Sequence, residues 1–237
     1  MTFTILGTCP RTGKVGFAQT TSTSAIGGRR TARALSGIGA FTIQAYGSAP
    51  VADLTENLIR LGYGASKVVD DVCASDRFAE WRQIAVVLKN GDVACYTGAK
   101  AVQWAGQVQG ANYAALGNVL VGAKVVEAMG KAFEASVDEE LEERLMRGIE
   151  AGRDAGGQPD GQTSAVLHVF HAHSYPIIDL RVDMDPEPAG ALRRIFDWYK
   201  PLVPYYMART VDPSSVPRYK QWLSERGLPL NPFEAES

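Results

Sequence analysis

The chain has 237 residues, of which 46% are apolar and 21% are charged, and its formal net charge at pH 7 is -2. This composition is typical of a globular protein with one substantial core, so we expect a main domain over residues 1–200 and a tail over residues 201–237. Lysine and arginine are scattered, which excludes the clustered basic footprint of a nucleic-acid partner. With no run of about 18 apolar residues and no signal-peptide pattern, we expect a cytoplasmic protein without a membrane partner.

The cysteines and histidines give no pattern for a metal site. The three cysteines are odd in number and lack C-x-x-C spacing, which predicts free, mostly buried thiols. His168, His171 and His173 are close in sequence, but on a strand only His171 and His173 share a face. Structural zinc needs four ligands, so we expect neither a metal nor a cofactor.

The first third of the chain predicts a hairpin, a further strand and two helices. Pro10 and Gly13 are spaced as turn residues between two short apolar runs. A third run is small and apolar, as in a strand buried on both faces, and helical spacing of apolar residues follows it. The predicted elements are strands at residues 3–7, 14–20 and 37–46 and helices at residues 51–62 and 65–73.

The rest of the main domain continues with hairpins and helices. Asn90-Gly91 is a strong signal for a two-residue hairpin turn, and Ser136 with Glu139 predicts a capping box at the start of a helix. We therefore expect antiparallel sheets flanked by helices, an α+β fold. The elements are strands at residues 82–88, 92–96, 103–108, 113–116, 163–170 and 177–182, and helices around residues 125–133, 141–149 and 192–199.

Residues 201–237 differ from the rest in being rich in proline and aromatic residues. Large aromatic side chains are unfavourable in water when they gather on a surface. We therefore expect this tail to pack on the body of the protein or on a partner subunit, and the chain to form a homodimer or a higher homo-oligomer.

Thr2 is the most suggestive residue of the chain, because it begins a strand and becomes the N-terminal residue if Met1 is removed. A free α-amino group has a pKa of about 7.7 to 8.0, so part of it is neutral and can act as a base for the hydroxyl of the same residue. The opposite interpretation is an ordinary β-branched strand residue. A retained Met1 favours that interpretation, since it holds the nitrogen in a peptide bond.

Motifs along most of the chain carry a family resemblance. They are the Met-Thr-Phe-Thr-Ile start, Gly37-Ile-Gly-Ala, Gln44-Ala45, Arg82-Gln83, Thr97-Gly98, Trp104-Ala-Gly, Gly117-Asn118-Val-Leu, Val126-Glu-Ala-Met, Ala155-Gly-Gly, Gly161-Gln-Thr-Ser-Ala and Asp179-Leu-Arg-Val-Asp. With them, residues 1–198 resemble the DUF1028 family, which is Ntn-hydrolase-like, that is, similar to N-terminal nucleophile hydrolases. The resemblance implies a four-layer αββα sandwich, with two antiparallel sheets between helical layers and an active cleft where the sheets open.

The chain also departs from the family pattern. Thr21-Ser22-Thr23-Ser24 stands where the family usually has Ser-Arg and two aromatic residues, and Tyr96 replaces a histidine that many members have before Thr97. The aspartate and lysine that support the nucleophile in proteasome-type relatives have no clear counterparts. Thr20 or Thr21 is near the first position, and Arg30 or Arg33 could replace the second.

The candidate site residues follow from the chemistry and from the family motifs. Thr2 is the candidate nucleophile, and the oxyanion donors are the backbone N–H groups of Tyr46, Gly47 and Ser48, with the Asn118 side chain as second choice. Hydroxyl-rich loops often bond their own backbone, and arginines on a loop are often only solvated, so both alternatives stay open for the remaining set. The expected substrate-binding residues are Thr21, Ser22, Ser24, Arg30, Arg33 (with Arg29 beside them), Gln44, Asp160, Gln162 and Ser164.

Two functional hypotheses result. The first is an N-terminal nucleophile amidohydrolase that cleaves a small amide, peptide or ureido substrate with Thr2 and without a cofactor. The second is a catalytically silent sandwich that binds a small ligand or a partner protein. Ser22 or Ser24 as nucleophile is a weaker scheme, because the sequence offers no histidine base near them.

Overall fold

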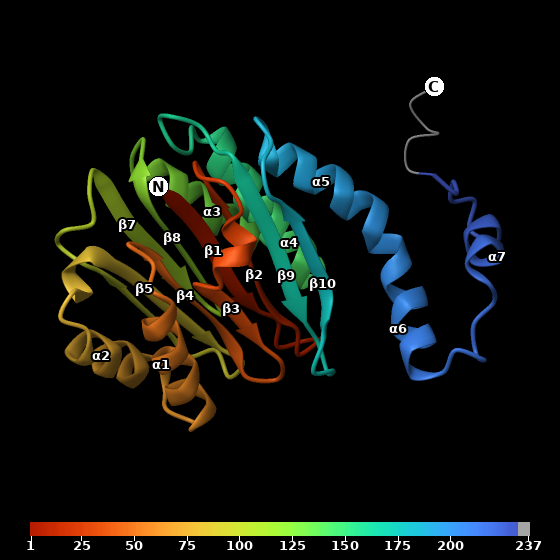
Figure 1. The fold of residues 1–237 in the computed structure, drawn as a ribbon, viewed down its shortest axis with the longest axis horizontal. Coiled ribbons are helices and arrows are strands. Elements are labelled where there is room, and N and C mark those ends of the chain that lie inside the picture. The colour runs from red at the N-terminus through yellow and green to blue at the C-terminus, as the bar shows by residue number, and fades with distance from the viewer. Residues whose placement is uncertain (232–237) are drawn as a thin grey trace. The chain divides into compact units, whose positions relative to one another are not determined.

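The computed structural model describes residues 1–231, and the chain divides into two units, Met1–Leu192 and Arg193–Ser237. The first unit contains both sheets and the four helices between residues 49 and 154, and residues 188–224 form further helices (Figure 1). Among the described residues, no helix is both long and apolar enough to cross a membrane.

The larger sheet has six strands in the order β10-β9-β2-β1-β8-β7, and each neighbouring pair is antiparallel. Its centre is the N-terminal hairpin, in which Gly13 has a φ of +74°, a value that suits a glycine in the turn. The bounds are β1 (Thr2–Thr8), β2 (Val15–Thr21), β7 (Trp104–Gly110), β8 (Tyr113–Leu120), β9 (Ser164–Phe170) and β10 (Pro176–Val182).

The smaller sheet has four antiparallel strands in the order β3-β4-β5-β6. The hairpin at Asn90-Gly91 joins β5 and β6 as expected, and Gly91 has a φ of +88° there. The edge strand β3 was not expected, because the sequence around it reads as a basic loop. The bounds are β3 (Ala32–Leu35), β4 (Gly39–Ala45), β5 (Arg82–Leu88) and β6 (Val93–Thr97).

Helices cover the outer face of each sheet. Phe3 and Ile5 of β1 point to the helical layer and pack against Gly152 and Gly148 of α4. A β-carbon at Gly152 would lie 3.0 Å from the Phe3 ring, and one at Gly148 would lie 2.8 Å from Cδ1 of Ile5. On the other sheet, Ile43 packs in a cluster with residues of α1 and α2. The four-layer αββα sandwich is thus confirmed (Figure 1). The layers are α3 (Lys124–Ala135) with α4 (Leu141–Asp154), and α1 (Ala49–Arg60) with α2 (Ala65–Ser75).

The space between the two sheets is filled by the inward-facing side chains of both. At one end it is an apolar core that contains Leu6, Phe17 and Leu116. Burying each such side chain stabilises the fold by about 1.5–3 kcal/mol. At the other end, the same strands place Thr2, Thr4 and further polar side chains inward, and this end contains the candidate site described below.

Two local predictions were wrong. Ser136 does not cap α4; it follows α3, and its hydroxyl donates to the carbonyls of Ala132 at 2.8 Å and Phe133 at 3.2 Å. The residue before α4 is instead Glu140, which makes no side-chain cap hydrogen bond. His171 and His173 do not share a strand face, because β9 ends at Phe170.

Beyond the sandwich, the chain continues in short helices. Residues 201–231, expected as a tail, contain two helices whose aromatic rings contact one another, with 5.2 Å between the ring centroids of Tyr205 and Trp222. The packing of the tail on the body or on a partner subunit stays a prediction. The remaining elements are α5 (Pro188–Tyr199), η3 (Lys200–Leu202), α6 (Val203–Val211) and α7 (Tyr219–Ser224), and, in the first unit, the 3-10 turns η1 (Ile26–Arg29) and η2 (Ala79–Trp81).

Candidate active site at the first strand

Thr2 lies in a cavity of about 330 Å³ at the polar end of the layer between the sheets. The six-stranded sheet contributes the start of β1 and part of β2, and the four-stranded sheet contributes the end of β4. The turn η1 and the N-terminus of α1 complete the wall. The cavity is lined by Thr2, Gln19, Ile26, Arg29, Thr31, Gln44, Ala45, Gly47 and Ala49.

The Thr2 hydroxyl is buried and has one hydroxyl neighbour. Thr2 is 7% exposed, and its Oγ1 lies 3.1 Å from Oγ1 of Thr21, the residue that faces it on β2. The Thr21 hydroxyl also donates a hydrogen bond to the carbonyl oxygen of Met1. With Met1 in place, the nitrogen of Thr2 is part of a peptide bond and is not a base.

An α-amino group at this end of the chain has a lowered pKa. Burial lowers the pKa of the Met1 amino group, and the positive charge of Arg29 lowers it further. Both causes disfavour the charged form. Thr2 is more buried than Met1, which is 36% exposed, and it shares its cavity with Arg29.

The N-terminus of α1 presents backbone donors at the cavity. Gly47 and Ser48 have N–H groups without an acceptor within residues 1–231, whereas the N–H of Tyr46 donates to the Trp81 carbonyl at 3.3 Å. Ser48 caps the helix, because its Oγ accepts from the N–H of Val51 at 3.4 Å. Free N–H groups at a helix N-terminus attract negative charge.

The turn from β4 into α1 is strained. Ala45 has a φ of +67°, in the left-handed region, which costs a non-glycine residue roughly 1–2 kcal/mol. Two residues later, a β-carbon on Gly47 would lie 2.9 Å from Cγ2 of Thr31 and 3.2 Å from the carbonyl oxygen of Ile43. The glycine is therefore required for the close approach that brings this backbone to the cavity.

A network of buried side-chain amides lies behind Thr2 and joins the two sheets. Gln44 Oε1 accepts from the Thr4 hydroxyl at 2.5 Å and from Gln19 Nε2 at 3.4 Å. Gln44 Nε2 donates to Gln83 Oε1 at 3.1 Å, and the same oxygen accepts from Asn118 Nδ2 at 2.9 Å. Because each amide is fixed by the next, the orientations of Gln44 and Asn118 are set by the network.

Gln83 anchors this network to the six-stranded sheet. Its Nε2 donates to the carbonyl of Gly117 at 2.8 Å, to Thr97 Oγ1 at 3.0 Å and to the carbonyl of Gly106 at 3.3 Å. Gln83 and Gln19 were not among the expected site residues. The signal for both was a glutamine directly beside a buried apolar run, residues 15–18 before Gln19 and residues 84–88 after Gln83.

Asn118 and Thr21 lie beside Thr2, and Gln44 shares its cavity. Asn118 is the register partner of Thr2 on β8, but its side chain belongs to the buried network and is not part of the cavity wall. Thr21 contacts Thr2 directly. Of the expected substrate-binding residues, Gln44 lines the cavity, and so does Arg29, which was expected beside Arg30 and Arg33.

Of the other expected residues, Ser164 supports the loop after β2. Ser164 is fully buried, and its Oγ donates to the Thr23 carbonyl at 2.6 Å and accepts from the N–H of Ile26 at 3.1 Å. Ser24 is exposed, and the Ser22 hydroxyl is buried without a partner among the described residues. Asp160 is exposed and Gln162 half-buried; neither lines the cavity.

The arginines divide between two cavities. Arg29 lines the cavity of Thr2, whereas Arg30 and Arg33 line a different cavity of about 360 Å³. The guanidinium group of Arg33 is paired with Asp53 at 2.7 Å and with Glu56 at 2.8 Å. Arg29 is the last residue of η1 and Arg30 follows it, so these adjacent arginines face different cavities, and the roles of Arg30 and Arg33 in substrate binding stay predictions.

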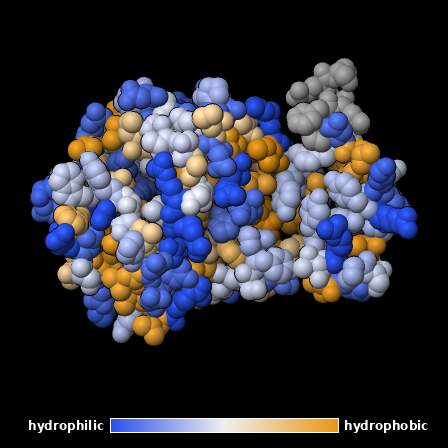
Figure 2. Space-filling model, viewed as in Figure 1, coloured by the Kyte–Doolittle hydropathy of each residue, from blue (hydrophilic) through white to orange (hydrophobic). Residues whose placement is uncertain are grey.

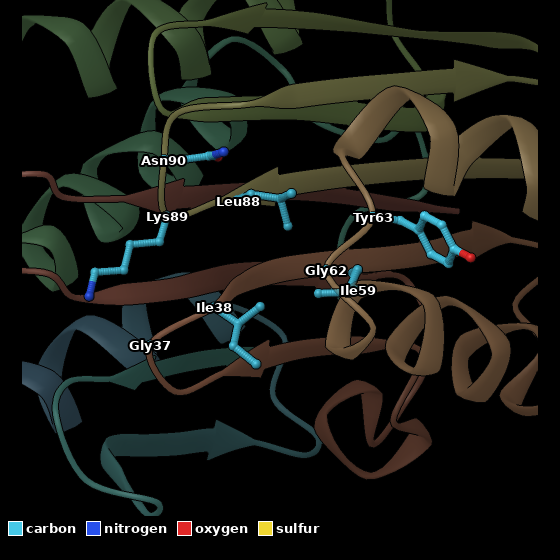
Figure 3. A pocket seen from close by; sticks show the side chains of 8 residues that line it. All are labelled: Gly37, Ile38, Ile59, Gly62, Tyr63, Leu88, Lys89 and Asn90. Atoms are coloured by element: carbon cyan, nitrogen blue, oxygen red, sulfur yellow. The ribbon is translucent and has the colours of Figure 1, made fainter.

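A larger hollow of about 520 Å³ lies elsewhere on the four-stranded sheet (Figure 3). It is formed by the β3–β4 turn, the β5–β6 turn and the link between α1 and α2. Ile38, Ile59 and Leu88 give it an apolar surface, with Lys89 and Tyr63 as its titratable groups. It contains no serine, threonine or cysteine, so it offers no nucleophile for acyl transfer.

Two of the three thiols, those of Cys73 and Cys95, are poor alternatives to Thr2. Burial raises the pKa of Cys95 to about 12, and burial together with the charges of Asp70 and Asp76 raises that of Cys73 to about 11. A thiol with such a pKa is almost entirely protonated at neutral pH and is a weak nucleophile. Within residues 1–231, no three histidine, cysteine or acidic side chains gather as a metal site would require.

Comparison with known proteins assigns the family. A crystal structure of a protein from Silicibacter pomeroyi, described as a member of DUF1028, has a TM-score of 0.76 and 30% sequence identity, covering 93% of this chain and 92% of that chain. The eukaryotic HslV of Trypanosoma brucei gives a TM-score of 0.44 and 11% identity, covering 72% of this chain and 99% of that chain. No curated protein matches the chain. A family model matches residues 2–192, and the chain therefore belongs to that family, described as a family of unknown function (DUF1028).

Proposed function

We propose that this protein, once Met1 has been removed, is an N-terminal nucleophile amidohydrolase that cleaves a small amide, peptide or ureido substrate with Thr2 as the nucleophile. The observation that carries the proposal is the position of Thr2. It begins the first strand in a cavity between the two sheets, 3.1 Å from the Thr21 hydroxyl. A free amine and a hydroxyl on one residue supply both base and nucleophile.

The proposed reaction has two steps. The neutral amine of Thr2, through a water molecule, takes the proton of the Thr2 hydroxyl while Oγ1 bonds to the substrate carbonyl carbon. The C–N bond then breaks, the proton passes to the leaving nitrogen, and an ester on Thr2 remains. In the second step, water activated by the same amine attacks that ester, releasing the acid and restoring the hydroxyl.

Backbone donors at the start of α1 would stabilise the negative oxygen formed in each step. The N–H groups of Gly47 and Ser48 have no acceptor within residues 1–231, and Gly47 lines the same cavity as Thr2. A fixed donor of this kind contributes roughly a hundredfold or more in rate. Tyr46 is a weaker candidate, because its N–H already donates to Trp81.

The state of the N-terminus tests the proposal. The intact mass of purified, active protein shows whether Met1 is present, and periodate cleaves the Cα–Cβ bond of an N-terminal threonine only when its amine is free. We expect loss of Met1 and conversion of Thr2 to a glyoxylyl group. A variant with a leucine inserted between Met1 and Thr2 is the control that should not react. Active protein that keeps Met1 throughout would contradict the mechanism.

Substitution of Thr2 tests its role directly. Screening amides, small peptides and carbamoylated amino acids for release of ammonia or amine provides the assay. Thr2→Ala should then lose activity by roughly a thousandfold or more, while Thr2→Ser keeps a measurable part. Thr8→Val is the matched control on the same strand, because the Thr8 hydroxyl is buried without a hydrogen-bond partner in the described chain. Full activity in Thr2→Ala would contradict the Thr2 mechanism, whereas an unmodified protein that releases nothing from any of these compounds would favour the second hypothesis, a silent sandwich that binds a ligand or a partner protein.

We also propose that the chain forms a homodimer or a higher homo-oligomer in which residues 201–237 pack on the body or on a partner subunit. The proline and aromatic content of this segment supports the proposal. Sedimentation equilibrium of the full chain tests it, and a monomer at all concentrations would contradict it. The cytoplasmic location stays a prediction that cell fractionation can check.

A further inference from the structure

A second cavity, of about 360 Å³, lies between β3 of the four-stranded sheet and strands β9 and β10 of the six-stranded sheet. The turn η1 separates it from the cavity of Thr2. Ile26 and Arg29 of that turn line the cavity of Thr2. Gly27 of the turn and Arg30, the residue after the turn, line the second cavity. Figure 2 shows hydrophilic residues gathered over this middle part of the first unit.

One wall of this cavity is aromatic. The ring of His168 lies between two phenyl rings, with its centroid 5.6 Å from that of Phe17 and 5.0 Å from that of Phe170, and both contacts are edge-on. Burial lowers the pKa of His168, the nearby charge of Arg181 lowers it further, and Asp179 partly opposes both. A neutral imidazole between two phenyl rings is a surface on which a planar apolar group packs well.

Two arginines of the cavity are available to a ligand. The guanidinium group of Arg30 has no acceptor within residues 1–231. Arg181 has Asp179 at 3.9 Å, which is longer than a hydrogen bond. The Arg181 side chain crosses η1 at Gly27, where a β-carbon would fall 2.4 Å from its Cδ. Glycine at this position therefore leaves room for the arginine stem.

The remaining charges of the cavity neutralise one another. Glu56 accepts hydrogen bonds from Arg33 and Arg60, each at 2.8 Å. Burial alone would raise the pKa of Glu56, but these two arginines outweigh it and hold the pKa below its ordinary value. Glu56 is therefore an anion paired with its own arginines. Asp179 also lines the cavity and forms an ion pair with Arg181 at 3.9 Å, but the N–H groups of Arg181 donate no hydrogen bond within residues 1–231, so Arg30 and Arg181 have donors for a bound anion.

We propose that this second cavity binds a small aromatic carboxylate, with its ring against Phe17, His168 and Phe170 and its carboxylate on Arg30 and Arg181. Guanidinium groups bind carboxylates with two parallel hydrogen bonds, and the aromatic wall holds the ring. The volume falls within the range of about 300–1,000 Å³ for small-molecule sites. The site does not depend on the Thr2 chemistry and can be tested without it.

The probe for the test is 2-naphthoate, and the reporter is the NMR signal of the His168 ring. Titration should shift this signal, while the ring signals of His171 and His173, which do not line the cavity, stay in place. The neutral analogue 2-naphthamide has the same ring and should bind roughly tenfold more weakly or worse, because it lacks the charge. No shift of His168, or equal binding of both probes, would overturn the proposal.

Adjacent arginines provide a matched pair of variants. Arg30→Gln should weaken 2-naphthoate binding roughly tenfold or more, because a hydrogen bond to a charged group is lost. Arg29→Gln removes a charge of the same kind one residue away, in the other cavity, and should leave this binding unchanged. Thermal unfolding of both variants checks that they fold. Weakening by Arg29→Gln alone would move the binding site to the cavity of Thr2 and contradict the inference.

Discussion

The two ends of the layer between the sheets are built from the same strands but have opposite chemistry. At one end, Leu6 of β1, Phe17 of β2 and Leu116 of β8 form an apolar core. At the other end, Thr4, Gln19 and their neighbours make a network of hydrogen-bonded amides beside a cavity. One end stabilises the sandwich, and the other keeps the sheets apart with polar groups in fixed orientations.

This difference explains why the candidate site is where it is. Hydrophobic packing is not directional, so an apolar end would close over the start of β1 and fill the space beside Thr2. A buried amide must keep its hydrogen-bond partners, which fixes both its position and its orientation. The polar end can therefore hold an open, ordered cavity. The following predictions test this contrast.

The largest expected effect comes from the apolar end. Leu116 is fully buried in the core between the sheets. Leu116→Ala should lower the free energy of unfolding by about 2–5 kcal/mol, because it removes apolar contacts and leaves a cavity. Urea unfolding followed by circular dichroism measures this loss. A loss below about 1 kcal/mol would mean that the sheets close around the gap.

Removing the central amide should cost less stability but disturb the site. Gln83→Met keeps a similar shape but leaves Gln44 and Asn118 without their shared acceptor, which should lower the free energy of unfolding by about 1–3 kcal/mol. Activity per folded molecule should fall as well. Thr42→Val is the control, because the Thr42 hydroxyl is buried on β4 without a partner in residues 1–231. If Gln83→Met and Thr42→Val lower the activity equally, the network does not position the site.

A smaller effect, of opposite sign, is expected at the turn after β4. Ala45→Gly removes left-handed strain of roughly 1–2 kcal/mol and adds a chain-entropy cost of about 0.5–1 kcal/mol, so the free energy of unfolding should rise by up to about 1.5 kcal/mol. The melting temperature measures the change. A lower melting temperature would show that the Ala45 methyl group makes contacts worth more than the strain.

The smallest effect is a shift in pH dependence. Burial and Arg29 lower the pKa of the amine at this end of the chain, so the neutral base should form as pH rises through a value below about 8. Activity should therefore increase with pH and reach half its maximum below that value. Arg29→Gln removes a nearby cation, which favours the ammonium form and should move the midpoint to higher pH. Profiles of kcat against pH compare the two proteins, and a midpoint that stays or falls would contradict this account.

Most of the fold could be predicted from local patterns. Alternation and turn residues such as Asn90-Gly91 identified the central strands, because those signals are physically local. The edge strand β3 was missed because Arg33 and its neighbours resemble a solvated loop until β4 lies beside them. The predicted capping box was wrong for a related reason. Ser136 forms its hydrogen bonds with the end of α3, and the sequence pattern does not show whether a serine between two helices bonds to the first or to the second.

The candidate site could be predicted less completely, because it depends on contacts between the sheets. Thr2 and Gln44 were identified by chemistry and by family motifs. Gln19 and Gln83 were not, since both act through Gln44, which Gln19 reaches from the other sheet, and no local pattern encodes the relative placement of the two sheets. Arg29 and Arg30 are consecutive, and only the geometry of η1 assigns them to different cavities.

The hydrogen bond from Thr21 to the Met1 carbonyl has a consequence for maturation. Removal of Met1 would take away this acceptor and create a new α-amino group on Thr2, next to a Thr21 hydroxyl released from its partner. Removal of Met1 would therefore place a free amine and a free hydroxyl side by side, and each can form a hydrogen bond with the other. Thr21→Val would show what the Thr21 hydroxyl contributes, because it leaves the new amine of Thr2 without that neighbour while keeping the shape of the side chain.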